Sequence, residues 1–294
     1  MAIKGERIPE LNTLKNLFFT TVRIQTEDET GGDDGVGTGF FYHIRDLDDH
    51  DQTYFTELLI TNKHVIKNAK RGKLVFHLGP AAEGFPTGGT HELVIDDFES
   101  KFILHPDTDI DLCAINISPY LETIKKSTGK SVFYQALSFE QVPTDDELKN
   151  LFPIADVYMV GYPIGLWDQI NNLPIARRGV TASHPYFDFN EKSMGVVDIA
   201  CFPGSSGSPI ITFQRDDGIL RYYKDRGEKF TASVGRDAFA LLGILFSGEV
   251  TDIEGRLIVR DIPVKKERIP TTNIMVHLGY YIKAKELLVF ESLF

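Results

Sequence analysis

Short runs of strand-forming residues recur along the whole chain, and glycine, proline or acidic residues close each run. The first half contains "FFTTVRIQT", "TGFFYHI" and "YFTELLIT", and the second half contains "ADVYMVGYP", "SMGVVDIACF" and "FALLGILFSG". Runs rich in Val, Ile, Phe and Tyr between turn residues are typical of all-β proteins. The 25 glycines and 14 prolines among 294 residues supply the turns. We therefore expect an all-β fold, long enough for one large domain or two small ones.

Residues 118–153 interrupt this pattern with polar or helical sequence, including "PYLETIKKSTGK" and "TDDELKNLF". We interpret this stretch as the connection between two β halves, which predicts a division into residues 1–120, 121–155 and 156–294. A short helix is expected over residues 9–17, where leucines recur at helical spacing, and a closing helix from near Lys283. The polar residues 215–238 predict an extended hairpin or a mobile loop.

Charge and composition exclude several classes of partner. The net charge of −11 disfavours nucleic acid, whose binding needs a basic surface. No apolar run approaches the roughly 20 residues of a membrane helix, and the N-terminal residues lack the apolar core of a signal peptide. The two cysteines, Cys113 and Cys201, have no CxxC partner, which argues against a zinc site and fits a reducing compartment. We expect a soluble, cytoplasmic protein.

The segment "CFPGSSGSPI", residues 201–210, raises the question of whether one of its serines is a nucleophile. A lone Ser/Gly segment is most often a solvated turn. A serine nucleophile needs a base, a group that orients the base, and donors for an oxyanion. Gly204 permits a tight bend, so the N–H groups of Gly204 and Ser206 could converge on one point. Because position 208 is serine, the G-x-S-x-G elbow of α/β-hydrolases is not matched.

His64 and Asp111 are the candidate partners of Ser206. His64 ends the apolar strand in "LLITNKHVI", where a rigid scaffold can present a base, although a lone histidine there is more often a turn residue or a helix cap. Asp111 directly precedes an apolar strand in "HPDTDIDLCAI" and can accept the imidazole N–H, although a turn role fits it equally well. The neighbouring Asp107 and Asp109 fit the turn role better.

Several motifs together resemble the trypsin-like, chymotrypsin-fold serine peptidases, in the branch of the bacterial HtrA/Deg proteases. They are "TGFF" at 38–41, "ITNKHVI", "DIDLCAI", "VGYPIG", "PGSSGSPI", "LLGILFSG" and "LGYYIKAKELL", and they span residues 18–290 in the family's order. The resemblance implies two antiparallel six-stranded β-barrels with a C-terminal helix and a short N-terminal helix. It also implies that Ser206 is the nucleophile, His64 the base and Asp111 the orienting acid. It implies no metal and no organic cofactor.

The same resemblance indicates how a protein or peptide substrate binds. The substrate is expected as an extended strand along Phe246, Ser247 and Gly248. The pocket for the residue before the cut, P1, is expected to be lined by Ala200, Cys201, Phe202, Leu245 and Gly248. Ala200 lies where relatives specific for basic residues carry Asp, so we expect an apolar or small P1 residue rather than Lys or Arg.

Departures from the family pattern leave three functions open. Ser205 stands where many relatives have Asp or Asn, and no PDZ module is expected. The chain can be an active endopeptidase, a catalytically silent binding module, or a latent enzyme held shut by an internal segment or a regulatory partner. The acidic loop 27–34 fits a regulatory handle or a solvated loop. His184 fits a loop residue better than a second functional imidazole, and both cysteines fit apolar fillers better than a redox switch.

Overall fold

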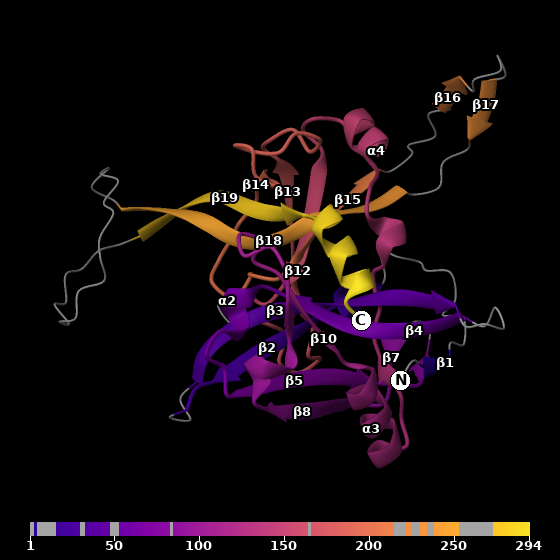
Figure 1. Cartoon of the computed structure of the whole chain (residues 1–294), viewed down its shortest axis with the longest axis vertical. Helices are drawn as coiled ribbons and strands as arrows, with labels where there is room; N and C mark the ends of the chain where they lie inside the picture. The colour runs from indigo at the N-terminus through magenta and orange to yellow at the C-terminus, as the bar shows by residue number, and fades with distance from the viewer. Residues whose placement is uncertain are drawn as a thin grey trace.

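Two β-rich halves, drawn one above the other in Figure 1, make up the body of the molecule. The computed structural model describes residues 3–4, 16–29, 33–47, 53–82, 85–163, 166–214, 221–224, 230–233, 238–252 and 273–294. Most of these residues lie in antiparallel strands, and the helices are few and short. The predicted all-β class is confirmed.

The first half is built around a large antiparallel sheet. Its strands are β1 (Ile3–Lys4), β2 (Thr21–Glu27), β3 (Asp33–Leu47), β4 (Thr53–Thr61), β5 (Arg71–Leu78), β8 (Thr90–Asp96), β9 (Ile103–Leu104), β10 (Cys113–Asn116) and β11 (Val132–Phe133). The hydrogen-bonded order is β11-β5-β2-β3-β4-β10-β9, while β8 pairs with β5 and β1 with β4. A small hairpin of β6 (Ala81–Ala82) and β7 (Phe85–Pro86) stands beside it.

This first sheet differs from a simple six-stranded barrel in how it closes. Strand β8 lies off the hydrogen-bonded path and pairs with β5 near one end of it, whereas β9 is the other end. The two strands are consecutive in the chain and joined by η2 (Phe98–Lys101). The segment β8–η2–β9 therefore acts as one interrupted strand that links the two ends. With it, six strand positions surround the core, and β1 and β11 are short additions.

The second half closes entirely through hydrogen bonds. The ring order is β12-β13-β14-β19-β18-β15, the six-stranded barrel that the sequence predicted. Its members are β12 (Asp156–Gly161), β13 (Ile175–Thr181), β14 (Met194–Asp198), β15 (Pro209–Gln214), β18 (Ala238–Asp252) and β19 (Asn273–Lys283). Within the predicted 215–238 insertion, β16 (Arg221–Lys224) and β17 (Phe230–Ser233) pair as an antiparallel hairpin.

Helices are confined to connections and to the C-terminus. They are η1 (Leu17–Phe19), α2 (Lys63–Ile66), α3 (Ser118–Thr128), η3 (Phe139–Gln141), α4 (Asp145–Asn150) and η5 (Ala284–Ser292). The predicted connection thus carries α3 and α4, and it also contributes β11 to the first sheet. Most of the predicted helix 9–17 lies outside the described residues, and the division at residues 120 and 155 stays a prediction. No helix in the described ranges has the length and apolar character needed to cross a membrane.

Three apolar cores stabilise this arrangement. One fills the first sheet, a second fills the second barrel, and the third lies between them. The third core joins Phe40 and Ile60 of the first half to Ile211 and Ile244 of the second. The closing helix η5, yellow in Figure 1, lies across this boundary and buries Phe290 in the same core. The two halves therefore form one packed unit, and their facing strand ends are held in fixed positions.

One carboxyl group is buried inside the first half. Glu57 of β4 is 5% exposed, and its backbone N–H donates to Ser118 Oγ at 2.9 Å. The Tyr134 hydroxyl hydrogen-bonds the Glu57 carboxyl, but burial still raises the pKa of Glu57 from 4.5 to about 7. Burial disfavours the charged form because the low-dielectric interior solvates a carboxylate poorly. The fold is therefore most compatible with the neutral acid.

Glu57→Gln is expected to change how stability depends on pH. Because the folded pKa lies above the unfolded value, the contribution of the wild-type acid is present below pH 4.5 and is lost as the pH rises through about 7. The glutamine stays neutral, so at pH 8 the variant should be more stable by up to about 3 kcal/mol. Urea unfolding at pH 5 and pH 8 measures this.

The matched control is Glu92→Gln, which removes an exposed carboxyl group from β8. We expect that control to follow the wild type at both pH values. A stability difference between Glu57→Gln and the wild type that is the same at pH 5 and pH 8 would contradict the assignment of Glu57 as a buried neutral acid.

Candidate active site

His64 and Asp111 form a direct pair at one end of the first half. His64 lies in α2, which begins two residues after β4 ends, and Asp111 lies just before β10, the hydrogen-bonded neighbour of β4. The distance from His64 Nδ1 to Asp111 Oδ2 is 2.5 Å. The backbone N–H of His64 also donates to Asp111 Oδ1 at 3.1 Å. Both carboxylate oxygens therefore hold the same histidine, which fixes its ring and leaves Nε2 without a partner among the described residues.

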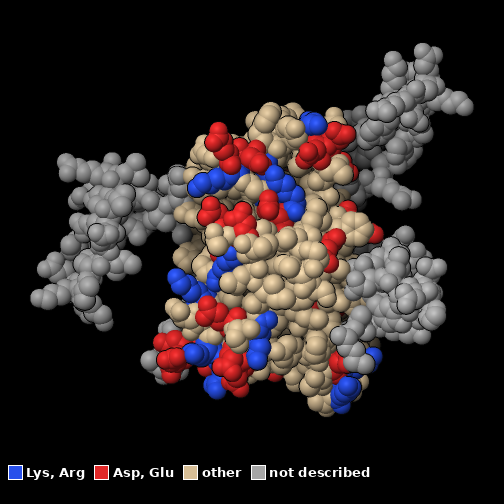
Figure 2. All heavy atoms as spheres, in the orientation of Figure 1, with Lys and Arg blue, Asp and Glu red and all other residues tan. Residues whose placement is uncertain are grey.

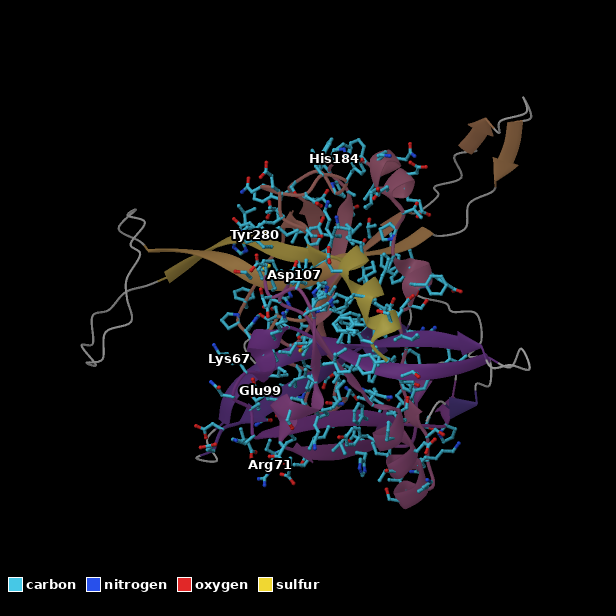
Figure 3. The ribbon with its side chains drawn as sticks, viewed as in Figure 1. Lys67, Arg71, Glu99, Asp107, His184 and Tyr280 are labelled. Atoms are coloured by element: carbon cyan, nitrogen blue, oxygen red, sulfur yellow. The ribbon has the colours of Figure 1, made fainter. Side chains whose placement is uncertain are left out.

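Neighbouring side chains fix this pair from behind. Asn62, fully buried, donates through its Nδ2 to the backbone oxygen of Asp111 at 2.8 Å. Lys63 Nζ donates to the backbone oxygen of Asp107 at 2.9 Å, and Asp107 Oδ1 accepts from the backbone N–H of Asp109. Asp107, labelled near the boundary of the two halves in Figure 3, therefore serves the turn, as the sequence predicted.

The Ser206 segment forms a tight double turn between β14 and β15. The N–H of Ser205 donates to Phe202 O and the N–H of Ser208 donates to Ser205 O, each at 3.0 Å. Gly204 and Gly207 both have left-handed backbone angles, with φ of +87° and +86°. Among the described residues, the N–H groups of Gly204 and Ser206 have no acceptor. Two free donors on either side of one bonded donor are what an oxyanion site requires.

Thr38 of β3 fastens this turn to the first half. Its backbone N–H donates to Ser206 O and its Oγ1 donates to Gly204 O, both at 2.9 Å. Its own carbonyl accepts from Thr61 Oγ1 at 2.8 Å, and its Oγ1 accepts from the N–H of Tyr162 at 3.1 Å. Thr61 ends β4, directly before α2 and His64. The structure thus brings the Ser206 turn of one barrel against the strand ends that carry His64 in the other.

No hydrogen bond joins Ser206 to His64 in the described part of the chain. The side chain of His64 is 46% exposed, so nothing in the fold prevents a ligand or a side-chain rotation from reaching it. Hydrogen bonds between a nucleophile and its base are often long until a substrate binds. The structure therefore brings the three residues to one boundary without closing the last contact.

Cys201, one of the expected pocket residues, belongs to the apolar core of the second half and lies close to Gly248. A Cβ at Gly248 would lie 3.3 Å from the Cβ of Cys201, and a Cβ at Gly279 would overlap its sulfur. Burial raises the pKa of Cys201 to about 11, so the thiol stays neutral near pH 7. Burial also raises the pKa of Cys113. Both cysteines are free and buried, in agreement with the expectation of apolar fillers.

The other predicted pocket residues lie on both sides of Cys201. Ala200 and Phe202 flank it in the chain, and Leu245 is buried in β18, with Phe246, Ser247 and Gly248 following at the surface. Strand β15 pairs with β18 only as far as Ile244, whereas β19 pairs with Ser247 and Gly248 on the other side. On the β15 side, Leu245 is still bonded to the serine turn, since Gly207 N–H donates to Leu245 O and Leu245 N–H donates to Ser208 O. Beyond Leu245, this edge of β18 has no neighbouring strand among the described residues.

Sequence reasoning missed two residues, Thr38 and Arg177. Arg177 of β13 donates from Nη1 to Ala200 O at 2.5 Å and from Nη2 to Ser205 Oγ at 2.9 Å. Ser205, which stands where many relatives have Asp or Asn, is fully buried and accepts this bond. A sequence signal existed in each case: a threonine at the start of an apolar strand, and two consecutive arginines in a strand of alternating faces.

His184 lies apart from this site. Figure 3 labels it at the far end of the second barrel, away from Asp107. Its Nδ1 accepts from the N–H of Tyr186 at 3.2 Å, which is a local turn contact. The expectation of a loop residue agrees with this geometry. Among the described residues, no group of His, Cys, Asp and Glu has the geometry to hold a metal.

Acidic and basic side chains alternate on the surface drawn in Figure 2. The described part of that face carries no broad basic area. Because nucleic-acid binding depends on such an area, this face gives no support to that partner.

Two linked barrels with a His–Asp pair on one and a serine turn on the other define a class of hydrolytic protein. The family comparison agrees with this class, because residues 37–217 match the family described as trypsin-like peptidase domain. That match covers more than half of the chain. The chain therefore belongs to the trypsin-like peptidase family, and its class is that of a serine protease.

Several solved proteases resemble the chain at low identity. Rv3671c from M. tuberculosis H37Rv, in its inactive form, is 13% identical over 98% of this chain and 94% of its own, with a TM-score of 0.43. The HtrA-type protease AlgW with a tripeptide is 14% identical over 96% and 62%, with a TM-score of 0.46. The serine endoprotease from Yersinia pestis is 16% identical over 98% and 68%, also with a TM-score of 0.46. No curated protein matches the sequence.

Gly207→Ala is expected to break the contact between the Ser206 turn and the first half. A Cβ at Gly207 would overlap Thr38 O, in addition to the cost of a left-handed φ. Gly89→Ala is the matched control, because Gly89 has the same φ of +86° but open space around it. The control should lose about 1–2 kcal/mol of unfolding free energy, and Gly207→Ala clearly more. Equal losses in urea unfolding would contradict the close approach.

Proposed function

We propose that the protein is a serine endopeptidase in which Ser206, His64 and Asp111 form the catalytic triad. One observation carries the proposal. The Ser206 turn is bound through Thr38 to the strand pair that ends at His64, and His64 is held by both oxygens of Asp111. Such a connection fixes the serine turn relative to the histidine, which a serine and a histidine that act on the same substrate require.

In the proposed mechanism, Ser206 Oγ attacks the carbonyl carbon of a peptide bond while its proton passes to Nε2 of His64. The carbonyl π electrons move to the oxygen, and the N–H groups of Gly204 and Ser206 donate to that oxyanion. Collapse of the tetrahedral intermediate breaks the C–N bond, and His64 gives its proton to the leaving amine. In the second half of the reaction, water attacks the acyl carbon while His64 takes its proton. The ester bond to Ser206 then breaks, and His64 returns the proton to Ser206 Oγ. Asp111 stabilises the imidazolium in both halves.

The proposed substrate is an extended peptide with an apolar or small P1 residue. The edge of β18 after Leu245, which has no neighbouring strand among the described residues, supports strand addition along Phe246, Ser247 and Gly248. Cys201 and its contact with Gly248 support a small pocket. The guanidinium of Arg177, bonded to Ala200 O, supports the exclusion of Lys and Arg, because two nearby cations repel each other in a partly buried site.

We also propose that the enzyme is latent in the cytoplasm until a regulatory partner or the substrate completes the site. The absence of a hydrogen bond between Ser206 and His64 in the described structure supports this state, as does the position of Cys201 beside Gly248. The same missing hydrogen bond favours the second candidate, a catalytically silent binding module. The two candidates differ in one property, which is whether Ser206 ever becomes nucleophilic.

A fluorophosphonate probe tests the nucleophile. We expect wild-type protein to be labelled at Ser206, and Ser206→Ala to lose labelling completely. His64→Ala should lower the labelling rate by several orders of magnitude, because the base is removed. Ser208→Ala is the matched control, since Ser208 Oγ is buried without a hydrogen-bond partner among the described residues and its loss should cost little. Wild-type protein that stays unlabelled with every candidate activator and peptide would favour the binding module.

A peptide-library cleavage profile tests the pocket. We expect cleavage after small or apolar residues, because Cys201 limits the volume and no acid lies at Ala200. Cys201→Gly, which removes the filling side chain, should broaden the profile toward larger P1 residues. A wild-type profile dominated by Lys or Arg at P1 would contradict the proposed specificity.

A further inference from the structure

Two consecutive arginines of β13 have opposite surroundings. Arg178 is 64% exposed and forms a bidentate pair with Asp156 on the neighbouring strand, at 2.8 and 3.2 Å. Arg177 points to the other face of the strand, as successive strand residues do, and it is partly buried. The exposed pair needs no special explanation, because surface ion pairs are common and weak. The partly buried Arg177, in contrast, needs an explanation.

The guanidinium of Arg177 connects the beginning and the end of the Ser206 loop. It donates to the carbonyl of Ala200 and to the hydroxyl of Ser205, the residue directly before Ser206. Ser205 Oγ also accepts from the N–H of Phe202 at 3.4 Å. One planar group thus fixes two points of the loop, which span only four intervening residues. A planar fork with several donors suits this task better than a flexible ammonium group.

The charge of Arg177 is not matched by a nearby acid. No carboxylate forms an ion pair with it in the described part of the chain, and its buried Nε has no hydrogen-bond partner there. Burial lowers the pKa of Arg177 to about 10, which still leaves it charged near pH 7. Burying a cation without a counter-ion is unfavourable. A hydrophobic residue of similar length would fill the same space at lower cost, so the hydrogen bonds themselves are the gain.

The loop needs such support because its own geometry is permissive. Gly204, in the middle of the loop, has a φ of +87° and the conformational freedom of glycine. The N–H groups of Gly204 and Ser206 make no bond in the described structure that would hold them in place. Thr38 fixes the carbonyl of Gly204 from the side of the first half. Arg177 fixes the other side, so the loop is clamped between the two barrels.

We propose that Arg177 is a positioning residue, which holds the loop from Ala200 to Ser206 in the shape that keeps the N–H groups of Gly204 and Ser206 free for the oxyanion. The inference rests on the proposed role of Ser206. Arg177 does not contact the reacting atoms. It acts through the carbonyl of Ala200 and the hydroxyl of Ser205, and it takes the place of a covalent or ionic clamp inside the second barrel.

The test compares Arg177→Ala, Arg177→Lys and the matched control Arg178→Ala in fluorophosphonate labelling. For Arg177→Ala we expect the maximal labelling rate to fall about 100-fold, while the probe concentration for half-maximal rate changes little, because the donors are used in the reaction rather than in binding. Arg177→Lys should keep part of the rate. Guanidinium chloride well below its denaturing range should restore Arg177→Ala by occupying the vacated site. Arg178→Ala should match the wild type.

Hydrogen–deuterium exchange over residues 200–208 tests the clamp without catalysis. In Arg177→Ala the N–H groups of Ser205 and Ser208, both bonded in the wild type, should exchange faster, while Arg178→Ala leaves them unchanged. Unchanged exchange, or a folded Arg177→Ala labelled at the wild-type rate, would overturn the role of Arg177 and leave the proposed function of Ser206 untouched. A rate loss that follows unfolding and is not restored by guanidinium would also overturn it. Labelling of wild-type protein at another serine would overturn the proposed function, and this inference with it.

Discussion

The hydrogen bonds of Thr38 determine whether the two barrels can share a site. Its N–H and Oγ1 hold Ser206 O and Gly204 O, and its carbonyl is held by Thr61. Thr38 and Thr61 are fully buried, where an unpaired polar atom costs about 1–3 kcal/mol. The barrels therefore meet in one register, because a shift would leave several such atoms unpaired. Apolar contacts between Phe40, Ile60 and Ile211 tolerate small shifts, but this set of hydrogen bonds does not.

Some contacts that hold the site join residues of neighbouring strands or of one turn, and others join residues far apart in the sequence. The His64–Asp111 pair is local to two neighbouring strands of the first half, so strand register alone brings its members together. The Ser206 turn is local to one connection of the second barrel. Thr38, Arg177 and the backbone of Leu245 join the serine turn to strands outside it. Each acts through backbone carbonyls or a buried hydroxyl, so their partners do not depend on any particular side chain of the turn except Ser205.

This difference in distance explains what the sequence could predict. His64, Asp111 and Ser206 each lie at the end of a strand and within a short local pattern, and the all-β class follows from repeated strand-like runs. Thr38 contacts Gly204 across 166 residues of sequence, and no local pattern reports that. The linkage of β8 and β9 through η2, and the 3₁₀ form of η5, also depend on tertiary contacts that propensity does not contain.

The state of the site follows from which contacts are already made. Two parts of the site are already formed. His64 is bonded to Asp111, and the loop of Ser206 is held by Thr38 and Arg177. The contact between Ser206 and His64 is the one that would cross from barrel to barrel through side chains alone. The side chain of His64 is 46% exposed, and exposed side chains rotate within nanoseconds. The structure thus contains a preformed histidine pair and a preformed serine turn, and the contact between the two is the one that is not made.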